Sequence, residues 1–158
     1  MKWVAKENIH LTLKFLGEVG NDKIETIKTI LDNIAVGERS FQISLNGVGL
    51  FPNADFPKIV WVGLGKGSGE ASHIAVKIDE ELSKIGFQRE SRLFVSHLTL
   101  GRLRSGKNRD ALKEKILSVP HSPESHKPEI INSIILFKST LTPQGSIYEK
   151  VHESRLAE

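Results

Sequence analysis

The tetrapeptide His-Leu-Thr-Leu occurs twice in this chain of 158 residues, beginning at His10 and again at His97. Both copies lie in apolar-rich stretches, "IHLTLKFL" and "LFVSHLTLGRL", which predict β-strands. Side chains two positions apart on a strand project from the same face. Each copy therefore predicts a rigid display of one imidazole and one hydroxyl, backed by two leucines.

The rest of the chain alternates between helical and extended patterns. Apolar residues at helical spacing predict helices over residues 21–37, 70–86 and 108–119, and Asp22 is expected to cap the first of them, with Glu25 in the capping-box position. Further strands are expected over residues 41–50, 58–65, 129–140 and 146–154. Because each His-Leu-Thr-Leu strand is followed by a helix, we expect a duplicated strand–helix unit and an α+β fold with two pseudo-equivalent lobes.

Composition excludes several classes of protein. The chain has no cysteine, which excludes disulfides, thiolate zinc sites and cysteine nucleophiles and favours a cytoplasmic location. No apolar run is long enough for a membrane helix, and the start of the chain lacks the pattern of a secretory signal. The net charge of +3 and pI of about 9.2 favour anionic partners. The basic stretch "GRLRSGKNR", with Arg102, Arg104, Lys107 and Arg109, fits either phosphate binding or a solvated loop.

Two imidazoles and two hydroxyls in one groove would suit cleavage of a phosphoester. In-line displacement at phosphorus needs a base on the side of the attacking oxygen and an acid on the side of the leaving oxygen. Histidine can take either role near neutral pH, so His10 and His97 are the candidate pair. The hydroxyls of Thr12 and Thr99 can donate hydrogen bonds to the non-bridging oxygens. This chemistry requires no metal and no cofactor.

Two other interpretations of the histidines remain open. Each could be a packed or hydrogen-bonded strand residue without a chemical role. The pair could also bind a metal ion, although such sites normally have a third protein ligand. Neither histidine has an Asp or Glu two positions away on its strand.

The segments "WVAKENIHLTLKFLGEV" and "SHLTLGR" resemble the two HxTx signatures of the 2H phosphoesterases, and most of all the RNA 2′,3′-cyclic phosphodiesterase (2′-5′ RNA ligase-like) family. The resemblance extends over nearly the whole chain, including "PKIVWVGLG" and "LFKSTLTPQGSIYEKV". It implies one bilobal 2H phosphoesterase domain over residues 1–158, with an antiparallel sheet and helices in each lobe and an active-site groove between them. Relatives usually have another strand and helix ahead of the first segment, so that either these elements are absent or the chain is a fragment or a shortened gene model.

The resemblance also implies an activity: hydrolysis of the 2′,3′-cyclic phosphate at an RNA end to a 2′-phosphomonoester. His10 would be the proton donor to the departing 3′ oxygen and His97 the proton acceptor that activates water, while Thr12 and Thr99 would hold the phosphate. The residue five positions after each histidine also matches the family pattern: Phe15 after His10 and Arg102 after His97. Phe15 would stack on the nucleobase and Arg102 would contact the phosphate.

Strict alternation gives these flanking residues a competing interpretation. It places Phe15 and Arg102 on the core side of their strands, so that Phe15 is expected to pack in the core. To reach the groove, either residue would need a strand end or a bulge, and Gly101 would allow a bulge at Arg102. Lys14 shares the face of His10 and Thr12 and is expected either to add positive potential there or to be an ordinary surface lysine.

Three further hypotheses follow for function. The same site could join RNA ends through a 2′-5′ bond in the reverse direction. The chain could instead be a non-catalytic RNA- or nucleotide-binding module, or a cyclic phosphodiesterase for another nucleotide from tRNA processing. The expected partner is RNA with a 2′,3′-cyclic phosphate end or a cyclic nucleotide, and the expected state is a monomer without membrane contact.

Overall fold

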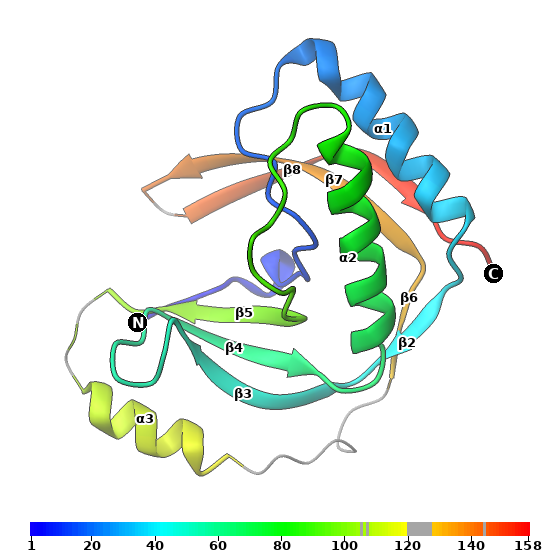
Figure 1. The fold of residues 1–158 in the computed structure, drawn as a ribbon. Helices are drawn as coiled ribbons and strands as arrows, with labels where there is room; N and C mark the ends of the chain where they lie inside the picture. Colours follow the sequence, from blue (N-terminus) through cyan, green and yellow to red (C-terminus); the bar gives the residue numbers. More distant parts are fainter. Residues whose placement is uncertain (105, 107, 120–127, 144) are drawn as a thin grey trace. The chain divides into compact units, whose positions relative to one another are not determined.

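The computed structural model describes residues 1–104, 106, 108–119, 128–143 and 145–158, so that Lys107 of the basic stretch lies outside the described residues. The elements in chain order (Figure 1) are β1 (Lys2–Trp3), a 3₁₀ turn η1 (Lys6–Asn8), α1 (Asn21–Val36), β2 (Phe41–Ile43), β3 (Leu45–Phe51), β4 (Ile59–Leu64), α2 (Ser68–Ser83), β5 (His97–Arg102), α3 (Arg109–Leu117), β6 (Glu129–Ile131), β7 (Ser133–Thr142) and β8 (Gly145–Arg155). The strands pair antiparallel in the β1-β5-β4-β3 sheet and in the β7–β8 hairpin, and the α+β class is confirmed.

The chain forms two compact units. Unit 1 comprises residues 1–12, 42–71 and 95–129, and unit 2 comprises residues 13–41, 72–94 and 130–158. Both His-x-Thr pairs, residues 10–12 and 97–99, lie in unit 1. The strands β2 and β6 form a separate two-stranded sheet.

Unit 1 is built on a four-stranded sheet in the order β1-β5-β4-β3 (Figure 1). The second His-Leu-Thr-Leu copy forms the inner strand β5, as predicted. Alternate residues of β4, Val60, Val62 and Leu64, are buried on one face of the sheet, which is the pattern of a sheet with one face against a core. The opposite face carries His97.

The first copy does not form the predicted strand over residues 9–16. Within it, only Leu11 pairs with β5, through an isolated antiparallel bridge to Leu98. The reason is a change of packing partner. Residues 10–12 belong to unit 1, whereas Leu13 and Leu16 pack against the hydrophobic core of unit 2. A chain that changes partner after three residues cannot keep one regular register.

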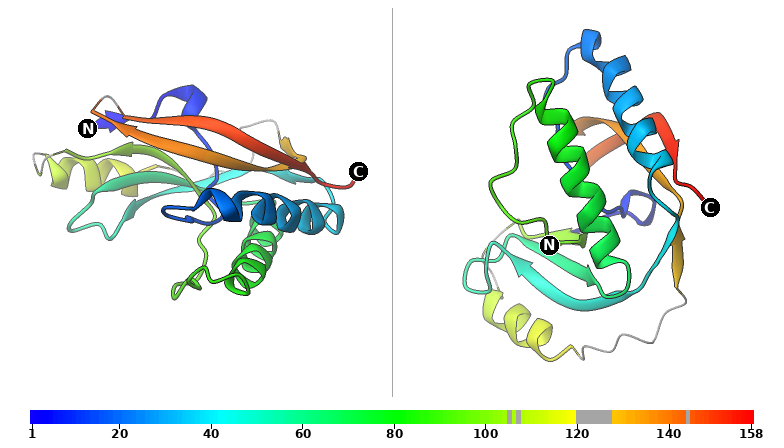
Figure 2. Two further views of the ribbon diagram at one scale, coloured as in Figure 1. Left: turned by 90° about the horizontal axis from the view of Figure 1, so that it is seen from above. Right: turned by 45° about the vertical axis from the view of Figure 1, so that its right-hand side comes forward.

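Unit 2 packs α1 and residues 72–83 of α2 against the β7–β8 hairpin. Figure 2 shows both helices on the same side of the hairpin, with α1 next to it. The predicted helical stripes form the core that holds these elements together, and its buried members are Ile27, Leu31, Ile34, Ala35, Ile74, Ile78, Leu82, Ile134 and Leu156.

The predicted cap of the first helix is wrong. The helix begins at Asn21 with Gly20 as its extended N-cap residue, and no side chain caps it. Asp22 therefore lies inside the first turn, where its charge still complements the helix dipole. Glu25 accepts a hydrogen bond from Lys28 Nζ at 2.7 Å instead of completing a capping box.

Candidate active site

The two His-x-Thr pairs lie next to each other in unit 1. The antiparallel bridge between Leu11 and Leu98 places His10 opposite Thr99 and Thr12 opposite His97, since neighbours of a bridged pair are themselves opposed. Directly opposed side chains project from the same face with Cβ atoms about 4.5–5.5 Å apart. All four side chains are half-buried. We call this side of the unit 1 sheet the histidine face.

Both imidazoles are held in the same way by the backbone. The Nδ1 atom of His10 lies 2.8 Å from the carbonyl oxygen of Asn8, and the Nδ1 atom of His97 lies 2.7 Å from that of Val95. A carbonyl oxygen can only accept, so each Nδ1 carries a hydrogen. In the neutral ring the lone pair is then on Nε2. Nε2 is therefore the ring nitrogen with which each histidine can accept a proton, or donate one when the ring is protonated.

Aromatic rings pack against His97. The His97 ring lies 5.0 Å from the ring of Phe51 and 6.0 Å from that of Trp61, both in edge-to-face geometry. Phe51 and Trp61 stack on each other at 5.0 Å. A Cβ atom at Gly49 would overlap the Trp61 ring, so that glycine makes room for the indole. These contacts fix the plane of the imidazole.

The two threonine hydroxyls are available for a ligand. Neither Thr12 nor Thr99 forms a side-chain hydrogen bond with any residue that the structure describes. A half-buried hydroxyl without a partner costs free energy unless water or a ligand satisfies it. Both are therefore suited to donate to an anion on the histidine face.

Arg102 reaches the histidine face because β5 bulges. Trp61 pairs with Thr99 and Val60 pairs with Gly101, which leaves Leu100 without a partner on β4. The extra residue reverses the alternation, so that Arg102 pairs with Ile59 and shares the face of Thr99. The bulge that Arg102 was predicted to need is thus present, immediately before Gly101.

Phe15 and Lys14 differ from their predicted positions. Phe15 is 77% exposed, so its expected place in the core is wrong. The neighbouring leucines take the inward positions, and Phe15 lines a pocket of unit 2 of about 310 Å³ with Phe87 and Arg89. Lys14 is not a surface lysine. Its side chain is 3% exposed, and Nζ lies 2.5 Å from Asp79 Oδ1.

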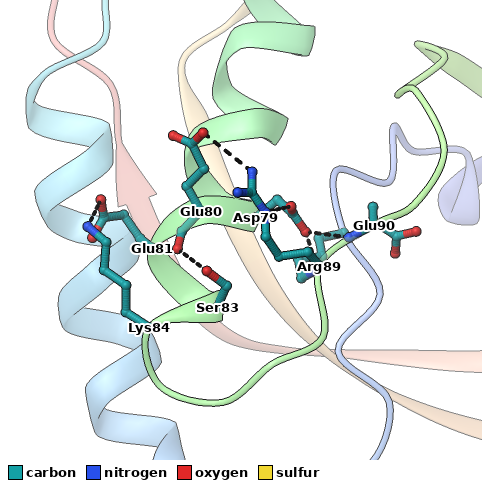
Figure 3. Close-up of polar contacts among 8 residues, drawn as sticks. Asp79, Glu80, Glu81, Ser83, Lys84, Arg89 and Glu90 are labelled. Carbon is teal, nitrogen blue, oxygen red and sulfur yellow. Dashed lines mark hydrogen bonds and ion pairs between the residues drawn. The ribbon is translucent and has the colours of Figure 1, made fainter.

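Asp79 is the centre of a polar cluster in unit 2 (Figure 3). It accepts hydrogen bonds from Lys14, from the backbone N–H of Glu90 at 3.0 Å and from Arg89 Nε at 3.1 Å. Burial alone would raise the pKa of this carboxyl group. The hydrogen bonds from Lys14, Glu90 and Arg89 outweigh burial and lower the pKa below its ordinary value. The cluster joins the segment after the first His-x-Thr pair to α2 and to the loop that follows it.

The described residues contain no group of three His, Cys, Asp or Glu side chains arranged to hold a metal ion. None of the helices in that part of the chain is long and apolar enough to cross a membrane.

Comparison with known proteins assigns the family. The model of the family described as "LigT like Phosphoesterase" matches residues 1–61 and 64–148. The chain belongs to this phosphoesterase family. An RNA 2′,3′-cyclic phosphodiesterase of Aeropyrum pernix is 40% identical over 157 residues, which cover 99% of this chain and 87% of that protein. One of Methanocaldococcus jannaschii is 37% identical, with 97% of this chain and 83% of that protein covered.

Solved structures show the same fold. The crystal structure of TT0787 of Thermus thermophilus matches with a TM-score of 0.80 at 21% identity, covering 98% of this chain and 81% of that one. Escherichia coli LigT in complex with 3′-AMP matches with a TM-score of 0.78 at 22% identity, covering 99% and 81%. At 21–22% identity, these two structures show that this chain has the same fold, and they show nothing further about it.

Several contacts of this phosphoesterase could not be found from sequence. The carbonyl groups of Asn8 and Val95 orient the imidazoles through the backbone, and no residue type signals such a role. Trp61 reads as ordinary core from its apolar surroundings. Trp61 belongs to the histidine face because it pairs with Thr99 across β4 and β5. The sequence alone does not give the register of these two strands.

Proposed function

We propose that residues 1–158 act as one phosphoesterase domain that hydrolyses the 2′,3′-cyclic phosphate at an RNA end to a 2′-phosphomonoester without a metal ion. The observation that carries this proposal is the bridge between Leu11 and Leu98, which sets both His-x-Thr pairs on one face of unit 1. The names and the high coverage of the Aeropyrum and Methanocaldococcus relatives support the choice of substrate.

The reaction begins at His97. Its Nε2 accepts a proton from a water molecule, and the water oxygen attacks phosphorus. The bond between phosphorus and the 3′ oxygen breaks, and His10 donates the proton that this oxygen needs. The phosphate remains on the 2′ oxygen, and the pair returns to its starting state when a proton passes from His97 to His10 through solvent. One histidine must therefore be neutral and the other protonated in the active form.

The remaining site residues bind the substrate. Thr12 and Thr99 donate to the non-bridging oxygens, where negative charge increases in the transition state. Arg102 supplies a fixed positive charge on the same face. Phe15 stacks on the nucleobase, a role that fits its exposure. A 5′ hydroxyl can take the place of water in the same site: His97 accepts its proton, its oxygen attacks phosphorus of the cyclic phosphate, and the bond to the 3′ oxygen breaks as His10 protonates that oxygen. The product is a 2′-5′ phosphodiester that joins two RNA ends.

One assay tests this function against a binding module. The protein is incubated with a 2′,3′-cyclic nucleotide in excess chelator, and the 2′-monophosphate is measured. We expect turnover that falls by about 10²–10⁴ in His10→Ala and in His97→Ala, the usual contribution of a general acid or base. His73→Ala is the matched control, because His73 is an exposed helical histidine. Ligand binding without turnover by the folded wild-type protein would contradict the proposal, and so would activity that the chelator abolishes.

A further inference from the structure

Two cations oppose each other on the histidine face. Lys2 of β1 pairs with Arg102 of β5, so that their side chains project from the same side of the sheet. We propose that Lys2 and Arg102 form a second anion subsite, which binds the phosphodiester preceding the cyclic phosphate of an RNA end. The inference rests on the proposed function and extends it from the reacting group to the chain behind it.

The backbone brings this pair together through two local features. The bulge at Leu100 turns Arg102 onto the histidine face, as described above. Gly101 allows β1 to approach closely, because a Cβ atom there would lie 3.2 Å from the carbonyl oxygen of Lys2 and 3.2 Å from the Trp3 ring. Regular alternation on β5 would turn the pair away from the histidine face, and a larger residue at position 101 would crowd β1.

The charge of Arg102 is not used by the described part of the fold. Like charges directly opposed on antiparallel strands are destabilising. Arg102 is exposed and forms no hydrogen bond or ion pair with any residue in the described ranges. A bound anion would supply the partner that Arg102 lacks, and Lys2 on the same face adds to the positive potential that attracts the anion.

The position of the pair separates it from the reacting phosphate. Arg102 is opposite Ile59, and Thr99 is opposite Trp61. Ile59 and Trp61 are two residues apart on β4, so that Arg102 and Thr99 lie about 7 Å apart along the strand direction. A phosphate held by the threonines and an anion held by Lys2 are thus neighbouring but distinct groups. A polynucleotide supplies a second phosphate at that point, whereas a cyclic mononucleotide does not. Arg102 has donors enough to contact both.

The test compares two substrates in three variants. The substrates are a 2′,3′-cyclic mononucleotide and a dinucleotide that ends in a 2′,3′-cyclic phosphate, and the quantity measured is the ratio of their kcat/KM values. We expect Lys2→Gln to lower the preference for the dinucleotide about fivefold, the effect of one solvent-screened charge contact. We expect Lys2→Arg to retain the preference. The matched control is Lys58→Gln, because Lys58 is an exposed lysine next to Ile59 and alternation places it on the opposite face.

The outcomes separate the two proposals. Turnover of both substrates with the same ratio in wild type and Lys2→Gln would overturn the subsite and leave the proposed function intact. An equal fall in Lys58→Gln would also overturn it, because the effect would then be one of net charge. If neither substrate is hydrolysed, the proposed function fails. The subsite is then tested by binding: the dissociation constants of a mononucleotide 2′-phosphate and a dinucleotide 2′-phosphate are measured. The wild type must bind the dinucleotide more tightly, and Lys2→Gln must lower this preference about fivefold.

Discussion

At the scale of single residues, the threonine hydroxyls distinguish a catalytic surface from an ordinary sheet. Each stands beside an imidazole of the other motif, and each lacks a hydrogen-bond partner among the residues of known placement. Folding alone gives no reason to keep a hydroxyl there, because valine has the same shape and a higher strand propensity.

Thr99→Val should therefore lower kcat/KM for a 2′,3′-cyclic nucleotide by about 10²–10³, the usual cost of losing one donor to a developing oxyanion. The thermal midpoint should stay constant or rise. Thr29→Val is the control, since Thr29 is an exposed residue of α1 that donates only to Glu25 O. Wild-type activity in Thr99→Val would show that this hydroxyl does not contact the phosphate.

Alternation predicted the paired imidazole and hydroxyl in each motif, and residues 97–102 form a strand that displays them as expected. The same rule failed for Phe15 and Lys14. It assumes that one strand continues through residues 9–16, whereas the chain leaves unit 1 after Thr12. The point at which a segment changes its packing partner depends on residues that are distant in sequence. The local spacing of apolar residues therefore cannot predict that point.

At the scale of elements, the Lys14–Asp79 pair fixes the segment that follows the first motif. Both side chains are largely buried, so the loss of one partner leaves the other charge poorly compensated. The partner was not predictable, because 65 positions separate Lys14 from Asp79.

Asp79→Asn should destabilise the protein by about 3–5 kcal/mol at pH 7, the cost of leaving a buried charge unpaired. The pKa of Asp79 is lowered in the folded state. The stability it contributes is therefore complete above the unfolded pKa of about 3.9 and is lost as the pH falls through the lower folded value. Urea unfolding at pH 7 and at pH 3 should show the difference between wild type and variant shrinking in acid.

Glu81→Gln is the matched control for that experiment. Glu81 lies on the same helix and pairs with Lys84 at the surface, so its loss should cost less than about 1 kcal/mol. A difference between wild type and Asp79→Asn that stays constant down to pH 3 would mean that the ionised carboxylate does not supply the stability.

At the scale of the whole molecule, neither unit is a continuous piece of chain. Each is assembled from three separate segments, so neither can be excised or complete its core before the other has much of its chain in place. The helix periodicity predicted which residues form the core of unit 2. Two lobes were predicted, but which segments form each unit could not be, because that depends on pairings between distant segments.

We therefore expect a single cooperative unfolding transition. Both tryptophans, Trp3 and Trp61, lie in unit 1, whereas α1 and most of α2 lie in unit 2. Tryptophan fluorescence and far-UV circular dichroism thus report mainly on different units. Their urea midpoints should coincide, and two separated midpoints would show that the units unfold independently.

The most direct test of two-histidine chemistry is the pH dependence of kcat/KM for a 2′,3′-cyclic substrate between pH 5 and pH 9, measured in chelator. A base and an acid that must be in opposite protonation states produce a bell-shaped profile. We predict a bell-shaped profile for the wild type. The residual activity of His97→Ala should no longer decrease at acid pH, and that of His10→Ala should no longer decrease at basic pH. A flat wild-type profile, or an unchanged bell in both variants, would contradict an acid–base pair made of His10 and His97.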